Sequence, residues 1–437
     1  MSKPLRPVST VEVRPSSRIS ARLIRLFGVA LIRLIYRIRT VGLEHIPKHG
    51  GTLLLPNHVT FADAFFITAA CPRPVRFVMD ETFMASRVIR IFVRLFDTVT
   101  IRQDQPREAI RITIEALKNG DLVCLFPEGQ LTRTGTLSEL RRGFELIARK
   151  AGHPLLPMWC DGAWGSIFSF ERGHFFKKIP YQIPYGITVA FGSVMDSAGA
   201  NIPLVRAALL RCSAEAVSER FRESDLLHRL PRGHGEIFDR FRMLDSDTRR
   251  RMWINGYQLG QIAALPRNRE IHILSDCLIR SVDYGPLVAF SELYHSPLRV
   301  HERLNNGQGE NWIGGIKLRE QLKNSALPMN LTFYDFSEVA HCPLITAGVT
   351  HLPCLAINGI IVATSLPMAR AASHHGDLQN GIKAHSRGKL LPGFYLVEGG
   401  TEPLRIHGPS APEEGLQMTA GTLVDAEGFI IAPPVAV

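Results

Sequence analysis

The chain has 437 residues, of which 45% are hydrophobic and 21% are charged, and its formal net charge is +11. This composition excludes a disordered or collagen-like protein, and the length favours two domains over one. The seven cysteines are scattered without a CxxC pair, which argues against a cysteine-based zinc site and is typical of a reduced cytoplasmic protein. We therefore expect no metal.

The first forty residues carry much of the positive charge, with nine Lys and Arg against one Glu. The basic residues are not interleaved with aromatic side chains, which argues against nucleic acid. Apolar residues recur at helical spacing, and an opposite face carries Arg18, Arg22, Arg25 and Arg33. We expect residues 1–40 to form a basic amphipathic helix on anionic lipid, peripheral to the cytoplasmic face of the membrane. A helix docked on its own domain is the alternative.

From residue 41 to about 200, short apolar runs alternate with helical patterns. The candidate strands are 52–56, 75–79, 97–101, 121–126, 154–158 and 187–191. The candidate helices are 62–70, 84–95, 106–118, 138–151 and 203–222. Such alternation predicts an α/β fold, a sheet with flanking helices, over 41–222. The polar stretch 223–236 is broken by Pro and Gly and predicts a linker, followed by a second α/β domain over 237–437.

Asn57-His58 and Asp63 follow the first of these strands. Where a strand gives way to a helix, Asp63 can fold back onto one imidazole nitrogen, fix the tautomer and leave the other nitrogen as a general base. Open α/β sheets bind ligands at the carboxyl ends of their strands. A second pair with the same spacing, His234 and Asp239, lies at the predicted linker and is interpreted as a solvated turn.

A second candidate site follows the strand at 121–126. Glu128 and Gly129 end that strand in a turn, Arg133 lies in the polar loop beyond it, and Arg142 precedes a helical pattern. A carboxylate in such a turn can accept hydrogen bonds from a polyol, and arginines bind phosphate bidentately. Taken alone, the stretch slightly favours a strand-ending turn that carries solvated arginines.

Together, Asn-His-x4-Asp and the later Phe-Pro-Glu-Gly resemble the glycerolipid acyltransferase family, which includes 1-acylglycerol-3-phosphate acyltransferase. The segments FDTVTIRQD and PLLPMW resemble two further blocks of that family, and the resemblance covers about 40–200. It implies acyl transfer from acyl-carrier protein or acyl-coenzyme A to a lysophospholipid hydroxyl, with no acyl-enzyme, cofactor or metal. It implies that His58 is the general base and Asp63 orients it. The implied substrate-binding residues are Asn57, Arg102, Glu128, Gly129, Arg133 and Arg142.

Later segments are closer to one branch of the family. FPEGQLTRTG, LRRGFE, DGAWGSIFSFERGHFFKK and IPYGITVAFG resemble the acyltransferase part of the bifunctional 2-acylglycerophosphoethanolamine acyltransferase/acyl-carrier-protein synthetase. Lysophosphatidate enzymes usually have Thr-Arg-Ser after Pro-Glu-Gly, whereas this chain has Gln130-Leu131-Thr132 and a displaced Arg133. The difference favours lysophosphatidylethanolamine as the acceptor, with lysophosphatidic acid as the alternative.

Short pieces of 237–437 resemble an adenylate-forming synthetase, namely WIGGIKL, YDFSEVAHCPLI, RGKLLPGFYL and LRIHGPS. The phosphate loop of that family is not found, Thr422 stands at the position of its ribose-binding Asp, and the chain ends before its catalytic lysine. We therefore expect a degenerate domain that does not adenylate fatty acids, and an unrelated α/β domain is the alternative.

Two other functions stay open at this point. One is a non-catalytic protein that binds lipid or a carrier protein, against which the joint presence of His58, Asp63 and Glu128 argues. The other is an active acyl-protein synthetase, which would have to bind ATP.

Overall fold

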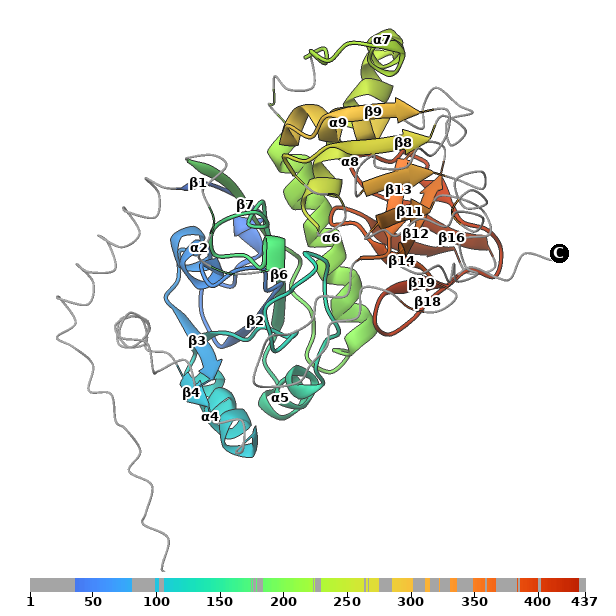
Figure 1. Ribbon diagram of the computed structural model, residues 1–437. Coiled ribbons are helices and arrows are strands. Elements are labelled where there is room, and N and C mark those ends of the chain that lie inside the picture. The colour runs from blue at the N-terminus through green and yellow to red at the C-terminus, as the bar shows by residue number, and fades with distance from the viewer. Residues whose placement is uncertain are drawn as a thin grey trace, which may run out of the picture.

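The computed structural model describes residues 36–80, 99–101, 106–173, 175, 178, 184–222, 224, 229–262, 265, 267–274, 285–301, 311–314, 322, 331–335, 349–357, 360–366, 383, 386–399 and 402–431. Two sheets dominate these residues, one in each half of the chain, and a long helix, α6 (Ile202–Phe221), runs between them (Figure 1).

The first half is built on a seven-stranded mixed sheet with the order β1-β7-β6-β2-β5-β3-β4. Its strands are β1 (Tyr36–Val41), β2 (Thr52–Pro56), β3 (Val75–Asp80), β4 (Val99–Ile101), β5 (Leu122–Cys124), β6 (Leu155–Asp161) and β7 (Tyr185–Phe191). Strand β2 lies in the middle and pairs in parallel with both β5 and β6. The carboxyl ends of these three strands therefore meet at one edge of the sheet.

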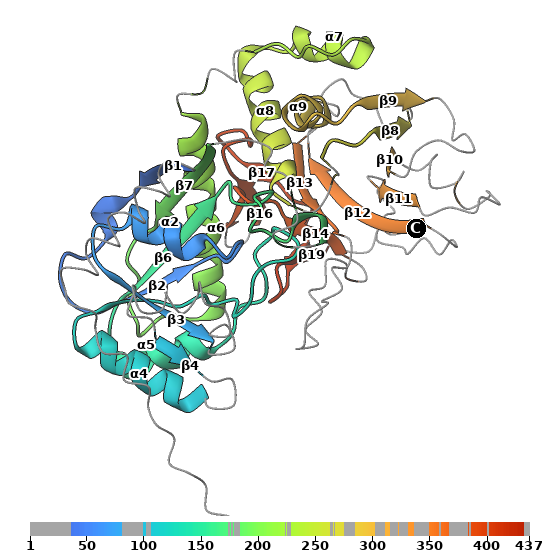
Figure 2. The same ribbon diagram turned by 60° about the vertical axis from the view of Figure 1, so that its left-hand side comes forward.

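Helices cover both faces of this sheet (Figures 1 and 2). The helices are α2 (Asp63–Ala70), α4 (Pro106–Lys118), α5 (Gly143–Ala151) and α6, with 3-10 turns at Leu43–His45 and Glu171–Gly173. In β2, Leu54 packs in the core on the α2 side, while Leu53 and Leu55 pack in the core with α4, α5 and α6. A strand buried on both faces reads as a continuous apolar run, which is why β2 is visible in the sequence.

The second half has a nine-stranded sheet with the order β18-β19-β14-β13-β12-β11-β10-β8-β9. Its strands are β8 (Ile271–Leu274), β9 (Leu298–His301), β10 (Asn311–Gly314), β11 (Leu331–Asp335), β12 (Val349–Ile357), β13 (Ile360–Thr364), β14 (Ser386–Leu390), β18 (Leu423–Val424) and β19 (Phe429–Ile431). A small sheet joins β15 (Tyr395–Gly399), β16 (Glu402–His407) and β17 (Leu416–Gln417), and the helices are α7 (Glu236–Met243), α8 (Ser246–Gly260) and α9 (Gly285–Tyr294).

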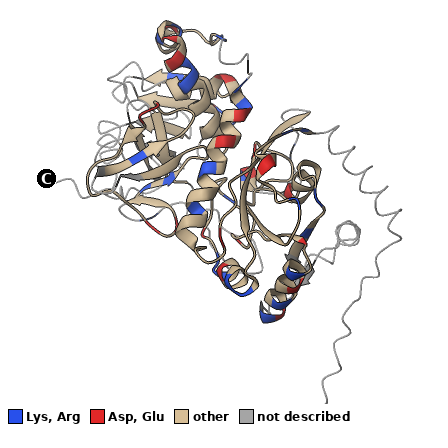
Figure 3. Ribbon diagram, turned by 180° about the vertical axis from the view of Figure 1, so that it is seen from behind, with Lys and Arg blue, Asp and Glu red and all other residues tan. Residues whose placement is uncertain are grey.

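The two halves pack against each other through α6 and α8. Leu210 of α6 packs against the main core of the second half and against the first-half core that contains Leu53 and Leu55, and Val217 joins a smaller cluster with Ile254 and Tyr257 of α8. The hydroxyl of Tyr257 donates to Asp161 Oδ2 at 2.7 Å across this boundary. Helix α4, which lies at the far end of the first sheet, carries residues of both charges (Figure 3).

The predicted α/β fold class is confirmed, and helix 106–118 has the predicted bounds. Helix 138–151 begins only at Gly143, because residues 138–141 are irregular and Arg142 forms the turn before the helix. The expected helix over 1–40 is wrong for residues 36–40, which are part of β1 and alternate between inward Tyr36 and outward Arg37. Residues 1–35 and the candidate helix 84–95 lie outside the described residues.

Among the residues that the structure describes, no helix is both long and apolar enough to cross a bilayer. Residues 229–235, in the predicted linker, are irregular, and α7 begins directly after them. In that segment His234 is exposed, and Asp239 pairs with Arg242 at 2.5 Å. His234 thus lies in an exposed, irregular stretch, as interpreted, whereas Asp239 lies in α7 and pairs with Arg242.

Candidate active site

The two candidate motifs lie side by side at one edge of the first sheet. Asn57 and His58 follow the carboxyl end of β2, and the turn with Glu128 and Gly129 follows β5. The two strands are hydrogen-bonded neighbours and run parallel, so that the loops leaving them emerge at the same edge.

His58 and Asp63 form the hydrogen bond expected from their spacing. His58 Nδ1 lies 3.0 Å from Asp63 Oδ2, and the carboxylate is fully buried whereas the imidazole side chain is 21% exposed. Because Asp63 can only accept, Nδ1 carries the hydrogen and Nε2 is left with its lone pair. The imidazole stacks on Phe126, with the ring centroids 3.8 Å apart. Phe126 thus packs on one face of the ring and Asp63 binds it at Nδ1, which leaves Nε2 available.

Asp63 is fixed by the turn that precedes α2. Its Oδ2 also accepts hydrogen bonds from the backbone N–H groups of Val59 at 2.7 Å and Thr60 at 2.9 Å. The hydroxyl of Thr60 donates to Asp63 Oδ1 at 2.7 Å. The carboxylate therefore remains bonded at three further donors when His58 is removed.

Glu128 braces the same loop from the neighbouring strand. Its Oε1 accepts the backbone N–H of His58 at 2.7 Å, and its Oε2 accepts the backbone N–H of Ser138 at 2.7 Å. Burial raises the pKa of this carboxyl group, and the two N–H donors oppose that shift. The backbone N–H of Thr132 donates to the His58 carbonyl at 2.7 Å. Residues 128–138 thus hold the His58 backbone on both sides.

The side chain of Asn57 joins β2 to β6. Its Nδ2 donates to the carbonyl of Cys160 at 3.2 Å, and its Oδ1 accepts the N–H of Cys160 at 2.8 Å. Asn57 is buried, and a contact with substrate would have to compete with these two bonds. The predicted substrate-binding role of Asn57 stays a prediction.

The other predicted contacts surround the Glu128 turn. Gly129 has a φ of 67°, in the left-handed region that favours glycine, and turns the chain back after β5. The guanidinium of Arg133 lies 4.6 Å from the ring centroid of Phe170, and burial lowers its pKa. Arg142 is exposed at the start of α5. Arg102 follows β4 and lies outside the described residues.

Sequence reasoning missed the residues that hold the candidate catalytic pair, His58 and Asp63. Thr60 precedes Asp63 by three positions, a capping-box spacing that was a readable signal in the sequence. Ser138, by contrast, reaches Glu128 through its backbone N–H, and a backbone contact leaves no trace in residue type.

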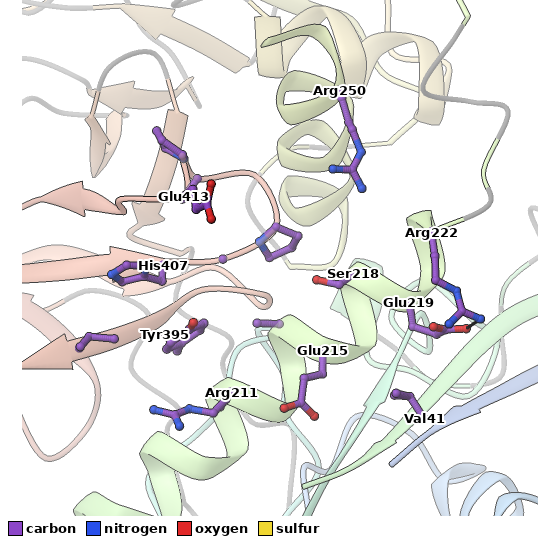
Figure 4. A pocket seen from close by; sticks show the side chains of 16 residues that line it. Val41, Arg211, Glu215, Ser218, Glu219, Arg222, Arg250, Tyr395, His407 and Glu413 are labelled. Atoms are coloured by element: carbon purple, nitrogen blue, oxygen red, sulfur yellow. Dashed lines mark ion pairs between the residues drawn. The ribbon is translucent and has the colours of Figure 1, made fainter. Parts of the chain in front are cut away.

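A cavity of about 800 Å³ lies elsewhere, between α6 and the small sheet of the second half. Figure 4 shows its charged lining, in which Arg211 of α6 extends toward Tyr395, with the guanidinium 5.4 Å from the ring centroid, while Glu215 points away from that ring. None of the candidate catalytic or substrate-binding residues lines it.

Residues 37–161 match the protein family described as "Acyltransferase". The match contains His58, Asp63 and Glu128, and it agrees with the expected enzyme class, an acyltransferase.

The acyltransferase region is similar to proteins named 1-acyl-sn-glycerol-3-phosphate acyltransferase. The one from Pseudomonas aeruginosa is 26% identical over 180 residues, 40% of this chain and 65% of that protein. The one from Bacillus subtilis is 23% identical over 138 residues, 31% of this chain and 68% of that protein. The chain spans 40–65% of the length of the first three curated relatives. A solved 1-acyl-sn-glycerophosphate acyltransferase from Thermotoga maritima is 19% identical, with a TM-score of 0.35, over 47% of this chain and 81% of that one.

Proposed function

We propose that the protein transfers an acyl group from a thioester to the free hydroxyl of a lysophospholipid, with His58 as general base. The observation that carries this proposal is the 3.0 Å contact between His58 Nδ1 and the buried Asp63 carboxylate, inside the segment that matches the acyltransferase family. The contact supplies a base whose tautomer is set and whose second nitrogen is available.

The proposed reaction needs no group besides the two substrates. His58 Nε2 removes the proton from the acceptor hydroxyl as its oxygen attacks the thioester carbonyl, and Asp63 stabilises the imidazolium that forms. When the tetrahedral intermediate collapses, the C–S bond breaks and the imidazolium returns the proton to the leaving thiolate. Glu128, both of whose oxygens accept backbone N–H groups, holds the His58 backbone in place during these steps.

Two acceptors remain candidates, each supported by a different observation. Gln130-Leu131-Thr132 after the Glu128 turn and the resemblance to the bifunctional branch favour lysophosphatidylethanolamine. The names of the relatives favour lysophosphatidic acid. Arg133 and Arg142 lie on the loop beyond Gly129 and are proposed to bind the phosphate that both lipids carry.

A competition experiment tests the proposal. The protein is given acyl-coenzyme A or acyl-carrier protein and equal amounts of the two lysophospholipids in mixed micelles, and the products are identified by mass spectrometry. We expect one acylated phospholipid to dominate and to be lost in His58→Ala. That variant should keep its fold, because Asp63 retains its bonds to Val59 and Thr60. If neither lipid is acylated with either donor, a non-catalytic lipid- or carrier-binding protein becomes the better proposal.

We further propose that the basic segment 1–40 brings the protein to anionic lipid on the cytoplasmic face of the membrane. The charge of that segment supports this proposal. Replacing Arg18, Arg22, Arg25 and Arg33 with Gln in the full chain should weaken sedimentation with vesicles that contain phosphatidylglycerol. The difference from the wild type should shrink as salt is added. Equal binding of the two proteins at low salt would contradict the proposal.

A further inference from the structure

Arg206 is a buried cation in the second turn of α6. Its side chain is 8% exposed, and its Nη2 donates to the backbone carbonyl of Ser138 at 2.9 Å. Its Nε is buried and has no hydrogen-bond acceptor among the residues that the structure describes. Burying a guanidinium costs several kcal/mol unless its surroundings compensate it, so a buried arginine points to a specific requirement at that place.

Ser138 connects this arginine to the candidate active site. The carbonyl of Ser138 accepts from Arg206, while its own N–H donates to Glu128 Oε2 at 2.7 Å. The other oxygen of Glu128 accepts the backbone N–H of His58 at 2.7 Å. Three consecutive hydrogen bonds therefore lead from the guanidinium to the backbone of His58.

The second half of the chain touches the other side of Arg206. At Gly428, in the turn between β18 and β19, an added Cβ would lie 2.8 Å from Arg206 Nη1. Asp425 Oδ1 holds that turn by accepting the backbone N–H groups of Glu427 and Phe429, each at 2.9 Å. Lys383 Nζ binds Asp425 Oδ2 at 2.5 Å and Glu427 Oε1 at 2.9 Å. A braced turn of the second half thus lies against the guanidinium.

Electrostatics link the same two sides. Burial lowers the pKa of Arg206, and the carboxylates of Glu128 and Asp425 oppose that shift. One of these carboxylates belongs to the active-site turn and the other to the second half. The charge of Arg206 therefore interacts with a carboxylate on each side.

We propose that Arg206 is a positioning residue through which the second half of the chain fixes the Glu128 turn and thereby the backbone of His58. The proposal rests on the proposed role of His58 as general base. In this proposal the second half of the chain supports the Glu128 turn, a role that needs no adenylating activity. Small displacements of a catalytic group cost large factors in rate, so a support of this kind affects turnover more than affinity.

Arg206→Met keeps the length and apolar part of the side chain and removes the charge and the donor. We expect kcat to fall about tenfold or more with KM changed little, because the Glu128 turn loses a charged hydrogen-bond donor and small displacements of a catalytic group cost large factors in rate. Arg206→Lys should restore part of the loss. The matched control is Arg211→Met, an exposed arginine of the same helix that lines the cavity in Figure 4, and it should leave kcat unchanged.

Gly428→Ala tests the contact from the other side. Its added Cβ has to displace Arg206. The control is Gly120→Ala, because Gly120 has a φ of +88°, close to the +87° of Gly428, and a Cβ added there meets nothing within 4 Å. The two variants share the backbone strain of alanine in the left-handed region, so only Gly428→Ala should lower kcat.

Hydrogen–deuterium exchange gives a readout that does not depend on activity. In Arg206→Met and Gly428→Ala, peptides covering 57–60 and 132–140 should exchange faster, and those covering the carboxyl end of α6 should not. If wild type shows no acyl transfer but these peptides respond, the proposed function fails and the support role stands. If both variants are folded and neither exchange nor kcat changes, the positioning role is refuted.

Discussion

Asp63→Asn separates the chemical role of the Asp63 carboxylate from its structural role. Asp63 Oδ2 binds His58 Nδ1 and the N–H groups of Val59 and Thr60, and Oδ1 binds only the Thr60 hydroxyl. An asparagine can place its carbonyl oxygen at the Oδ2 position and its NH2 against the hydroxyl, which can accept instead of donating. All three bonds at that oxygen then survive, and we expect a stability loss of only about 1 kcal/mol.

The catalytic effect should be far larger, because a neutral amide does not stabilise the imidazolium. We expect kcat to fall by about 10²–10⁴, equivalent to about 3–5 kcal/mol in the barrier. The assay is release of the donor thiol, read with a thiol reagent, alongside urea unfolding of the same protein. Asp63→Ala is the contrasting variant, because it leaves the buried N–H groups of Val59 and Thr60 without an acceptor at about 1–3 kcal/mol each.

A double variant sharpens the test. Once His58 is replaced by Ala, Asp63→Asn should cost no further activity, because its effect acts through the imidazole. A folded Asp63→Asn protein that keeps more than about a tenth of the wild-type kcat, a barrier change below 1.4 kcal/mol, would falsify the general-base assignment.

Three further outcomes are expected. Because burial raises the pKa of Glu128, the folded state binds the Glu128 proton more tightly than the unfolded state does. The free energy of unfolding should therefore fall as pH rises from the ordinary carboxylate range to that raised pKa. Urea unfolding at several pH values should show this slope in the wild type and lack it in Glu128→Gln. Asn57→Ala should destabilise the protein by about 2–5 kcal/mol in urea unfolding, because both backbone groups of Cys160 lose a buried partner, and unchanged stability would contradict the β2–β6 tie. Tyr257→Phe should lower stability by about 1–2 kcal/mol in thermal unfolding while leaving kcat within twofold, since it removes one bond to Asp161 between the halves.

Local patterns made the centre of the first sheet predictable. Strand β2 is buried on both faces and therefore uninterrupted in its apolar run, and the five-residue separation of His58 and Asp63 is bridged within a single turn. The helix predicted over 36–40 is wrong, because Tyr36 and Ile38 fit a strand period as well as a helical one. Pairing with β7 decides in favour of the strand. No local rule distinguishes these cases without the partner strand.

The supports of the site could not be predicted, because they join distant parts of the chain. Asn57 meets Cys160 103 positions later, and Arg206 reaches the backbone of Ser138 68 positions earlier. Backbone atoms are present at every residue, so a side chain that binds them has no partner to recognise in the sequence. A buried arginine in a helix is in addition indistinguishable, by type, from an exposed one such as Arg211.

Helix α6 belongs to two hydrophobic cores at once, and this has a consequence for how the protein melts. Val205 and Leu209 pack with the first sheet, Leu210 contacts both main cores, and Val217 packs with α8. Neither sheet can lose its partner without exposing the apolar surface of this shared helix. We therefore expect a single calorimetric transition for the two halves, and a chain cut within 223–236 to yield an aggregation-prone first fragment rather than an independent enzyme.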